Sequence, residues 1–271
     1  MSKKYFSFPY LIWMIGFTII PLALIFVYGV TDRQGHFTFN NITAITESVH
    51  YNALILALLL ALAATLICLF MAYPLSMILC NMSVNQNSIV VFLFILPMWM
   101  NFLLRTMAWQ TLLSKNGVIN SVLSFFGLPE FNIMNTSYAI ILGMVYNFLP
   151  FMVLPIYNSL VKIDPQIIDA ARDLGANKWS TFQKIILPIS LPGVISGITM
   201  VFVPALTTFV ISDLLGGGKI QLIGNIIEQE FKQGSNWNLG SGLSIVLMLF
   251  VFVSMAFTTN LDEEEAGGGT W

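Results

Sequence analysis

The feature that most restricts the fold of this chain is a series of apolar runs, each long enough to cross a lipid bilayer. A membrane-spanning helix needs about 20 mostly apolar residues, and six segments reach this length: residues 9–30, 53–80, 89–113, 137–160, 189–212 and 241–260. Charged residues make up only 9% of the sequence, against about 25% in soluble domains. The sequence therefore predicts an all-α polytopic membrane protein with about six transmembrane helices.

Lysine and arginine positions predict how the chain is oriented in the membrane. Basic residues are enriched in cytoplasmic loops, and Lys3 and Lys4 precede the first run, which places the N-terminus in the cytoplasm. With six spans, 81–88 and 161–188 are then also cytoplasmic. The inner segments carry six basic residues and the outer loops four, a weak bias of the same sign. We expect a single transmembrane domain over 1–260, followed by an acidic, glycine-rich, disordered tail over 261–271.

A polar passage, DAARDLGANKWSTFQKIILP, separates the fourth and fifth runs and carries five of the chain's 24 charged residues. Just before it, Asp164-Pro165 is typical of a helix start. Gly175 is typical of a helix end, and Asn177 can cap a second short helix. The pattern predicts a helical hairpin within 161–188, at the membrane surface.

The spacing of apolar residues predicts which side of this hairpin meets a partner. Ile167, Ala171 and Leu174 recur at i, i+4 and i+7 and would share one face of the first helix. Leu187-Pro188 is expected to end the hairpin and lead into the next span. From these residues alone, an ordinary interfacial loop and an element that enters a groove on a cytoplasmic partner are equally favoured.

A resemblance favours the second interpretation. The passage is similar to the EAA coupling motif of ATP-binding-cassette (ABC) importer permeases, with Asp in place of the usual Glu. The matching positions are Asp169, Ala170, Ala171, Gly175, Leu187 and Pro188. The resemblance implies a type I importer permease fold and a hairpin that docks in a cleft of an ATPase subunit. It also implies residence in a bacterial cytoplasmic membrane.

Two longer stretches of sequence indicate which kind of ABC importer permease the chain resembles. RDLGANKWSTFQKIILPISLPG and ISDLLGGGKIQLIGNIIEQEF look like the permeases of spermidine/putrescine importers. This implies a polyamine substrate and three kinds of partner: a second, homologous permease, two ATPase subunits and an extracytoplasmic substrate-binding protein. An importer for an iron complex, oxyanion or sugar remains the alternative.

Other classes of function lack their motifs. A phosphate-binding loop needs G-x-x-x-x-G-K-[ST], but GGGKI at 216–220 has Ile220 in place of the hydroxyl residue and Asp213 in place of the first glycine. We therefore expect no ATPase site of its own, and no cofactor or metal. A membrane-embedded enzyme would need G-x-S-x-G or H-E-x-x-H. A stand-alone carrier would show inverted repeats and several intramembrane charges.

Candidate substrate contacts come from ionisable and aromatic residues near the spans. Asp213, at the end of the fifth run, could pair with an ammonium group, cap its helix, or pair with Arg105. Aromatic faces bind cations and pack against methylene groups, or anchor span ends at the membrane interface. The aromatic candidates for the substrate path are Trp99, Trp109, Tyr146 and Phe209.

Overall fold

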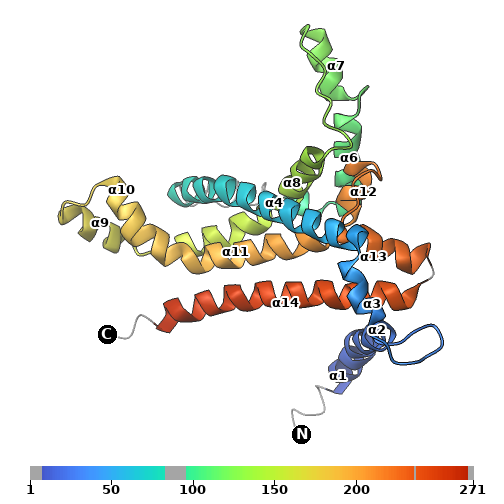
Figure 1. Cartoon of the computed structure of the whole chain (residues 1–271). Coiled ribbons are helices and arrows are strands. Elements are labelled where there is room, and N and C mark those ends of the chain that lie inside the picture. Colours follow the sequence, from blue (N-terminus) through green and yellow to red (C-terminus); the bar gives the residue numbers. More distant parts are fainter. Residues whose placement is uncertain (1–7, 83–95, 235, 268–271) are drawn as a thin grey trace. The chain divides into compact units, whose positions relative to one another are not determined.

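The computed structural model describes residues 8–82, 96–234 and 236–267, and these residues are mostly helical (Figure 1). Within these ranges the only β pairing is an isolated bridge between Thr31 and Phe37. Five helical segments are long and apolar enough to cross a membrane: Tyr10–Gly29, Ser48–Cys80, Ser137–Leu160, Lys178–Thr207 and Trp237–Ala256. The predicted all-helical membrane fold is confirmed. The remaining predicted run, 89–113, lies partly outside the described residues.

The described residues fall into two compact units. Unit 1 comprises residues up to Ile55 together with Leu222–Val253. It contains α1 (Phe8–Met14), η2 (Ile15–Ile19), α2 (Ile20–Gly29), α3 (Asn40–Thr43), η3 (Ala44–Thr46), α13 (Ile223–Lys232), the start of α4 (Ser48–Asn81) and most of α14 (Trp237–Gly267). Helix α14 includes 261–267, part of the predicted tail, and residues 268–271 lie outside the described part.

Two asparagines hold the end of α2 within unit 1. Asn41 Nδ2 donates to the carbonyls of Gly29 and Thr31, and Asn238 Nδ2 donates to those of Tyr28 and Thr31. The carbonyls at a helix end lack partners within the helix. The amides supply those partners, and so fix α2 to α3 and α14.

Unit 2 comprises Leu56–Gln221 together with the residues after Val253. Besides most of α4, it contains η4 (Leu96–Trp99), α6 (Phe102–Leu113), α7 (Val118–Phe125), α8 (Ser137–Leu160), α9 (Pro165–Asp173), α10 (Lys178–Thr181), η5 (Phe182–Ile186), α11 (Leu187–Thr207) and α12 (Val210–Gly216). Its centre is the pair α8 and α11, which run side by side in Figure 1. Gly193 meets Pro155, and Gly197 meets Met152. The absence of a Cβ at these glycines lets the two backbones approach closely.

Helix α4 is joined to this pair by polar contacts within an apolar surrounding. The Tyr73 hydroxyl lies 2.7 Å from Ser190 Oγ of α11, and Ser76 Oγ donates to the Val153 carbonyl of α8 at 3.2 Å. Both serines are fully buried. Such bonds hold α4 in one register against the two helices, because their groups would otherwise be buried without a partner.

Two prolines follow π-helical segments. Leu187-Pro188 was expected to end the hairpin and lead into the next span, and α11 does begin at Leu187, within a helix that is continuous from Lys178 to Thr207. Proline has no N–H for the usual bond to residue i−4. Residues Phe182–Ile186 adopt π-helix, and the N–H of Leu187 bonds to the Phe182 carbonyl. The wider turn carries the chain past the proline without ending the helix, and η2 does the same before Pro21.

The fifth predicted run is interrupted, which corrects its predicted end at residue 212. Helix α11 ends at Thr207, and Thr208 is extended with φ −68° and ψ 140°. A new helix, α12, begins at Val210. Thr and Phe are weaker helix formers than Leu or Ala, and Pro204 has already removed one hydrogen bond from the last turn. Together they account for the break.

Candidate functional site

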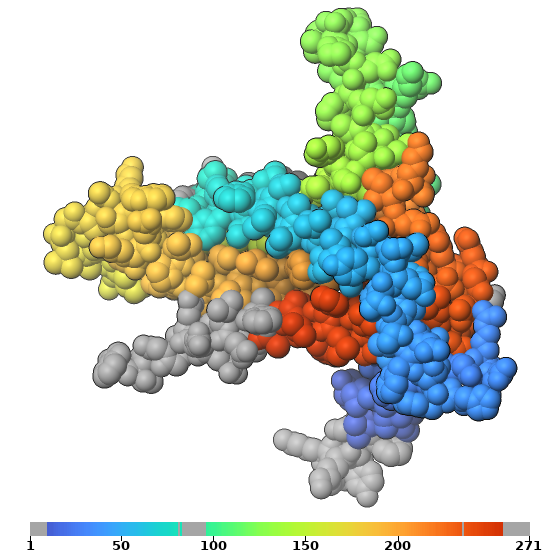
Figure 2. Space-filling model, in the orientation of Figure 1, coloured from blue at the N-terminus to red at the C-terminus, as the bar shows by residue number. Residues whose placement is uncertain are grey.

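The polar hairpin forms as predicted at its helix starts. Asp164 Oδ1 accepts a hydrogen bond from the Gln166 N–H at 2.9 Å, and Pro165 occupies the first turn of α9. Asn177 Oδ1 accepts from the Ser180 N–H at 2.8 Å and caps α10. The caps satisfy N–H groups that the helix itself leaves without partners. In Figure 2 the hairpin, in yellow, forms one end of unit 2.

Gly175 makes the turn between the two hairpin helices. Its φ is +83°, in the left-handed region that favours glycine. The Gly175 N–H bonds to the Arg172 carbonyl at 2.9 Å, and the Ala176 N–H bonds to the Ala171 carbonyl at 3.0 Å. These two bonds are the pair that defines a Schellman motif. The predicted helix-ending role of Gly175 is confirmed.

The predicted apolar face of α9 is wrong in one respect. Ala171 is 8% exposed within its own chain, whereas Ile167 and Leu174, which were placed on the same face, are 47% and 89% exposed. Ala171 therefore packs inside the unit, and Leu174 is the side chain left at the tip. The spacing of apolar residues could not show which of them the rest of the chain covers.

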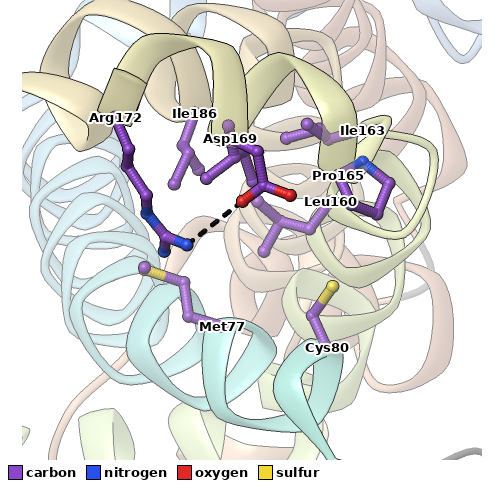
Figure 3. A pocket seen from close by; sticks show the side chains of 9 residues that line it. Met77, Cys80, Leu160, Ile163, Pro165, Asp169, Arg172 and Ile186 are labelled. Atoms are coloured by element: carbon purple, nitrogen blue, oxygen red, sulfur yellow. Dashed lines mark hydrogen bonds and ion pairs between the residues drawn. The ribbon is translucent and has the colours of Figure 1, made fainter. Parts of the chain in front are cut away.

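A cavity of about 280 Å³ lies between the hairpin and the ends of α4 and α8. Figure 3 shows Met77 and Cys80 of α4 facing Asp169 and Arg172 of α9 across it. The Asp169 carboxylate and the Arg172 guanidinium are 3.3 Å apart, and both side chains are largely exposed. Exposed pairs of this kind contribute about 0–1 kcal/mol. The cavity thus separates part of α9 from the ends of α4 and α8, while the second arm of the hairpin continues directly into α11.

The structure brings two of the substrate-path candidates together. The rings of Trp109 on α6 and Tyr146 on α8 meet edge to face, with centroids 5.2 Å apart. Both line an apolar groove of about 430 Å³, together with Ile67, Met71 and neighbouring residues of α8. A T-shaped pair leaves ring faces available to a cation or a methylene chain.

The other candidates form a separate group or stand apart. Phe209 precedes α12, and its carbonyl accepts from the Asp213 N–H at 2.9 Å. Asp213 is exposed and lies one turn along that helix. Trp99 lies in η4 and is 75% exposed. None of these three lines the groove of Trp109 and Tyr146.

The glycines that follow Asp213 have a structural role. Gly217 and Gly218 have φ of +59° and +71°, which ends α12 in a tight turn. A side chain at Gly217 would run into the amide of Asn135, whose own N–H bonds to the Leu215 carbonyl. The close contact at Gly217 shows that this turn is packed against Asn135.

Known proteins match this arrangement. The family of binding-protein-dependent transport system inner membrane components matches residues 4–264. The chain belongs to this family. Its curated relatives within the family include the spermidine/putrescine transport system permease protein PotB of Haemophilus influenzae, 36% identical over 253 residues, which are 89% of this chain and 88% of that protein. PotB of Escherichia coli is 37% identical over 245 residues, which are 88% of this chain and 89% of that protein. The chain is accordingly an ABC importer permease that spans the membrane several times.

Solved structures show the same fold at low sequence identity. A chain of a bacterial alginate ABC transporter superimposes with a TM-score of 0.81 at 17% identity. The match covers 96% of this protein and 93% of the alginate transporter chain. A chain of the MetNI methionine ABC transporter gives 0.57 at 16% identity, with 81% and 99% covered. The fold is that of ABC transporter permeases.

Proposed function

We propose that this chain forms half of the translocation pathway of a polyamine importer. A second permease supplies the other half, two ATPase subunits bind at the cytoplasmic side, and an extracytoplasmic protein delivers spermidine or putrescine. The N-terminus is cytoplasmic in this arrangement, because 161–188 then faces the ATPases. The chain contributes the pathway and the coupling element, and ATP hydrolysis occurs on the partner subunits.

The observation that carries the coupling role is the hairpin that turns at Gly175. It combines a fixed turn, exposed apolar side chains at Leu174 (89%) and Trp179 (64%), and charged residues around them. An exposed apolar tip with a polar rim is the composition of an interface that a partner covers. Asp169 and Ala170 are exposed beside it and are available to the same partner.

Support for polyamines comes from the PotB relatives and from side-chain chemistry. Flexible chains of ammonium groups need carboxylates or carbonyls for their charges and aromatic faces for their methylene groups. Asp213, Phe209 and the Trp109–Tyr146 pair offer such groups. An iron complex, oxyanion or sugar is the alternative solute, and an anion would favour unpaired basic residues in the spans.

Uptake by the complete transporter tests the proposal. The purified complex, reconstituted in liposomes with its ATPase and binding protein, should accumulate labelled spermidine and putrescine when ATP is supplied. Unlabelled polyamine should compete, whereas sulfate, maltose and ferric citrate should not. ATP-dependent uptake of one of those solutes, without polyamine uptake, would replace the proposed substrate and leave the coupling role in place.

We predict that Asp213→Asn lowers polyamine affinity or uptake if the carboxylate holds one ammonium group. A charge-assisted hydrogen bond contributes about 1.5–3 kcal/mol, which corresponds to roughly ten- to a hundredfold in affinity. Concentration-dependent uptake on matched preparations measures the effect. Asn caps a helix about as well as Asp, so normal uptake would remove Asp213 from the substrate path.

A third possible role for Asp213, besides substrate contact and helix capping, is a structural ion pair with Arg105. Arg105 is 7% exposed on α6, which contacts α12. If Asp213 offsets the charge of Arg105, then Asp213→Asn should lower the amount of folded protein rather than the affinity. Neutralising Arg105 in the same chain should then restore folded protein. Expression and ATPase retention, measured beside uptake, distinguish the cases.

A further inference from the structure

Three buried side-chain atoms in the described part of the chain have no hydrogen-bond partner: Arg105 Nε, Asn147 Oδ1 and Ser241 Oγ. Asn147 is 1% exposed and lies near the middle of α8, about 15 Å by helical rise from its start. Its Nδ2 donates to the Gly143 carbonyl at 2.9 Å. Because a carbonyl needs a donor, this bond identifies which end of the amide is oxygen. The remaining atom is therefore an acceptor deep in a membrane-spanning helix.

Helix contacts on either side of Asn147 bring it level with the break between α11 and α12. On one side, Gly197 of α11 meets Met152 of α8. On the other, Gly143 of α8 meets Ile211 of α12. The stretch of chain between these two contacts contains the last turn of α11 and the break itself. The unpartnered amide oxygen and the interrupted helix therefore lie at the same depth.

Further acceptors occur at this level of both helices. Pro150 removes the N–H that would bond to the Tyr146 carbonyl, and Pro204 does the same for the carbonyl of Met200. Helix α11 ends at Thr207, and the carbonyls of a last turn have no partners within the helix and form the negative end of its dipole. At this level the end of α11 and the two prolines contribute acceptors that suit a cation, and α12 begins beside them at Val210 with the N–H donors of its own first turn.

We propose that Asn147 Oδ1 and the carbonyls at the end of α11 bind an ammonium group of the transported solute. An ammonium group has three donors and no acceptor, so it complements a site made of oxygens. The adjoining Phe209 provides an aromatic face. The proposal rests on the polyamine function proposed above and deepens it by naming a neutral residue that recognises the solute. Asn147 is enclosed in this structure, and the solute reaches it when α8 and α12 separate during transport.

Two substitutions at Asn147 test the site in the complete reconstituted transporter. Asn147→Leu keeps the approximate size of the side chain and removes both its oxygen and the Nδ2 donor to Gly143, and Asn147→Ser keeps an oxygen on a shorter side chain. We expect the KM for spermidine and putrescine to rise roughly ten- to a hundredfold with Leu, and several-fold with Ser, at nearly constant kcat. Removing the unsatisfied oxygen offsets the loss of the hydrogen bond from Nδ2 to Gly143, so the melting temperature should change little.

Ser241→Ala is the matched control. Ser241 is 1% exposed, and its Oγ is also buried without a partner, but it belongs to α14 in unit 1. The control tests whether removing a buried oxygen that has no hydrogen-bond partner changes the KM merely by altering the packing. We expect its KM to equal that of the parent, and an increase like that of Asn147→Leu would overturn the assignment.

The outcomes separate this site from the proposed function. Parental polyamine uptake with an unchanged KM in both Asn147 variants overturns the site and leaves the function standing. A parent complex that takes up neither polyamine overturns both. If Asn147→Leu does not fold, Asn147→Ser decides, and an unchanged KM again overturns the site. If Arg105→Leu restores folding to Asn147→Leu, the amide pairs with the guanidinium and the ammonium site is wrong.

Discussion

Gly175→Leu is expected to reduce polyamine uptake roughly tenfold or more, while the protein still inserts in the membrane. The φ of +83° costs a residue with a Cβ about 1–2 kcal/mol, and tenfold corresponds to about 1.4 kcal/mol. No atom lies within 4 Å of the position that a Cβ would take. The effect is therefore one of backbone conformation, which shifts α10 relative to α9 and weakens docking on the ATPase. Pull-down of the ATPase in detergent, with uptake on the same preparation, measures it.

Gly127→Leu is the matched control for this change. Gly127 has a φ of +68°, lies in the same unit, and also has no atom within 4 Å of the place where a Cβ would stand. It carries comparable strain in a turn after α7, outside the hairpin. We expect its uptake and ATPase retention to stay close to those of the parent. Equal retention and uptake in the Gly175 variant would show that the hairpin turn is not part of coupling.

Ala171→Glu should abolish uptake and the recovery of the ATPase with the permease. The side chain is buried within its own unit, and removing an unpaired carboxylate from water costs several kcal/mol. The charge would displace α9 from its packing and change the surface presented to the partner. Limited proteolysis should then cut within 161–188 faster than in the parent, whereas detergent extraction and the remaining helical content stay the same.

Leu174→Glu separates the packing of the hairpin from its docking. Leu174 is 89% exposed, so a carboxylate there remains in water and leaves the fold of the hairpin intact. We expect parental resistance to proteolysis together with weaker ATPase retention. Parental retention would mean that the partner does not cover the tip. If Ala171→Glu resists proteolysis and couples normally, the packing role given to Ala171 is wrong.

Local chemistry made the hairpin predictable from sequence. The caps at Asp164 and Asn177 and the turn at Gly175 depend on side chains that act on backbone groups within a few residues, and all three were confirmed. The burial of Ala171 depends on how the rest of the chain packs on α9, and the apolar spacing of α9 did not contain that information. The passage of a helix beyond Pro188 depends on a π turn, which has no residue signature of its own.

The substrate path was only partly accessible for the same reason. Aromatic and ionisable residues near span ends could be chosen by type, but pairing Trp109 with Tyr146 required knowing how α6 crosses α8. Asn147 was overlooked among the candidates, although a carboxamide in the middle of an apolar run was the visible signal. Only the packing of the neighbouring helices shows that its oxygen is buried without a hydrogen-bond partner. The roles of Asp213 and of these aromatic residues in transport stay predictions.

The π-helical segment before Pro188 has a mechanical consequence. It makes the second arm of the hairpin and α11 one uninterrupted helix from Lys178 to Thr207, 30 residues in length, or roughly 45 Å. In the proposed complex such a helix is a lever arm, with one end docked on the ATPase and the other at the break that lies level with Asn147. A tilt of about ten degrees moves the far end of a rod of that length by roughly 8 Å, more than the width of an ammonium group. Because no loop interrupts the arm, a movement of the hairpin is passed along one continuous helix as far as the break at Thr208.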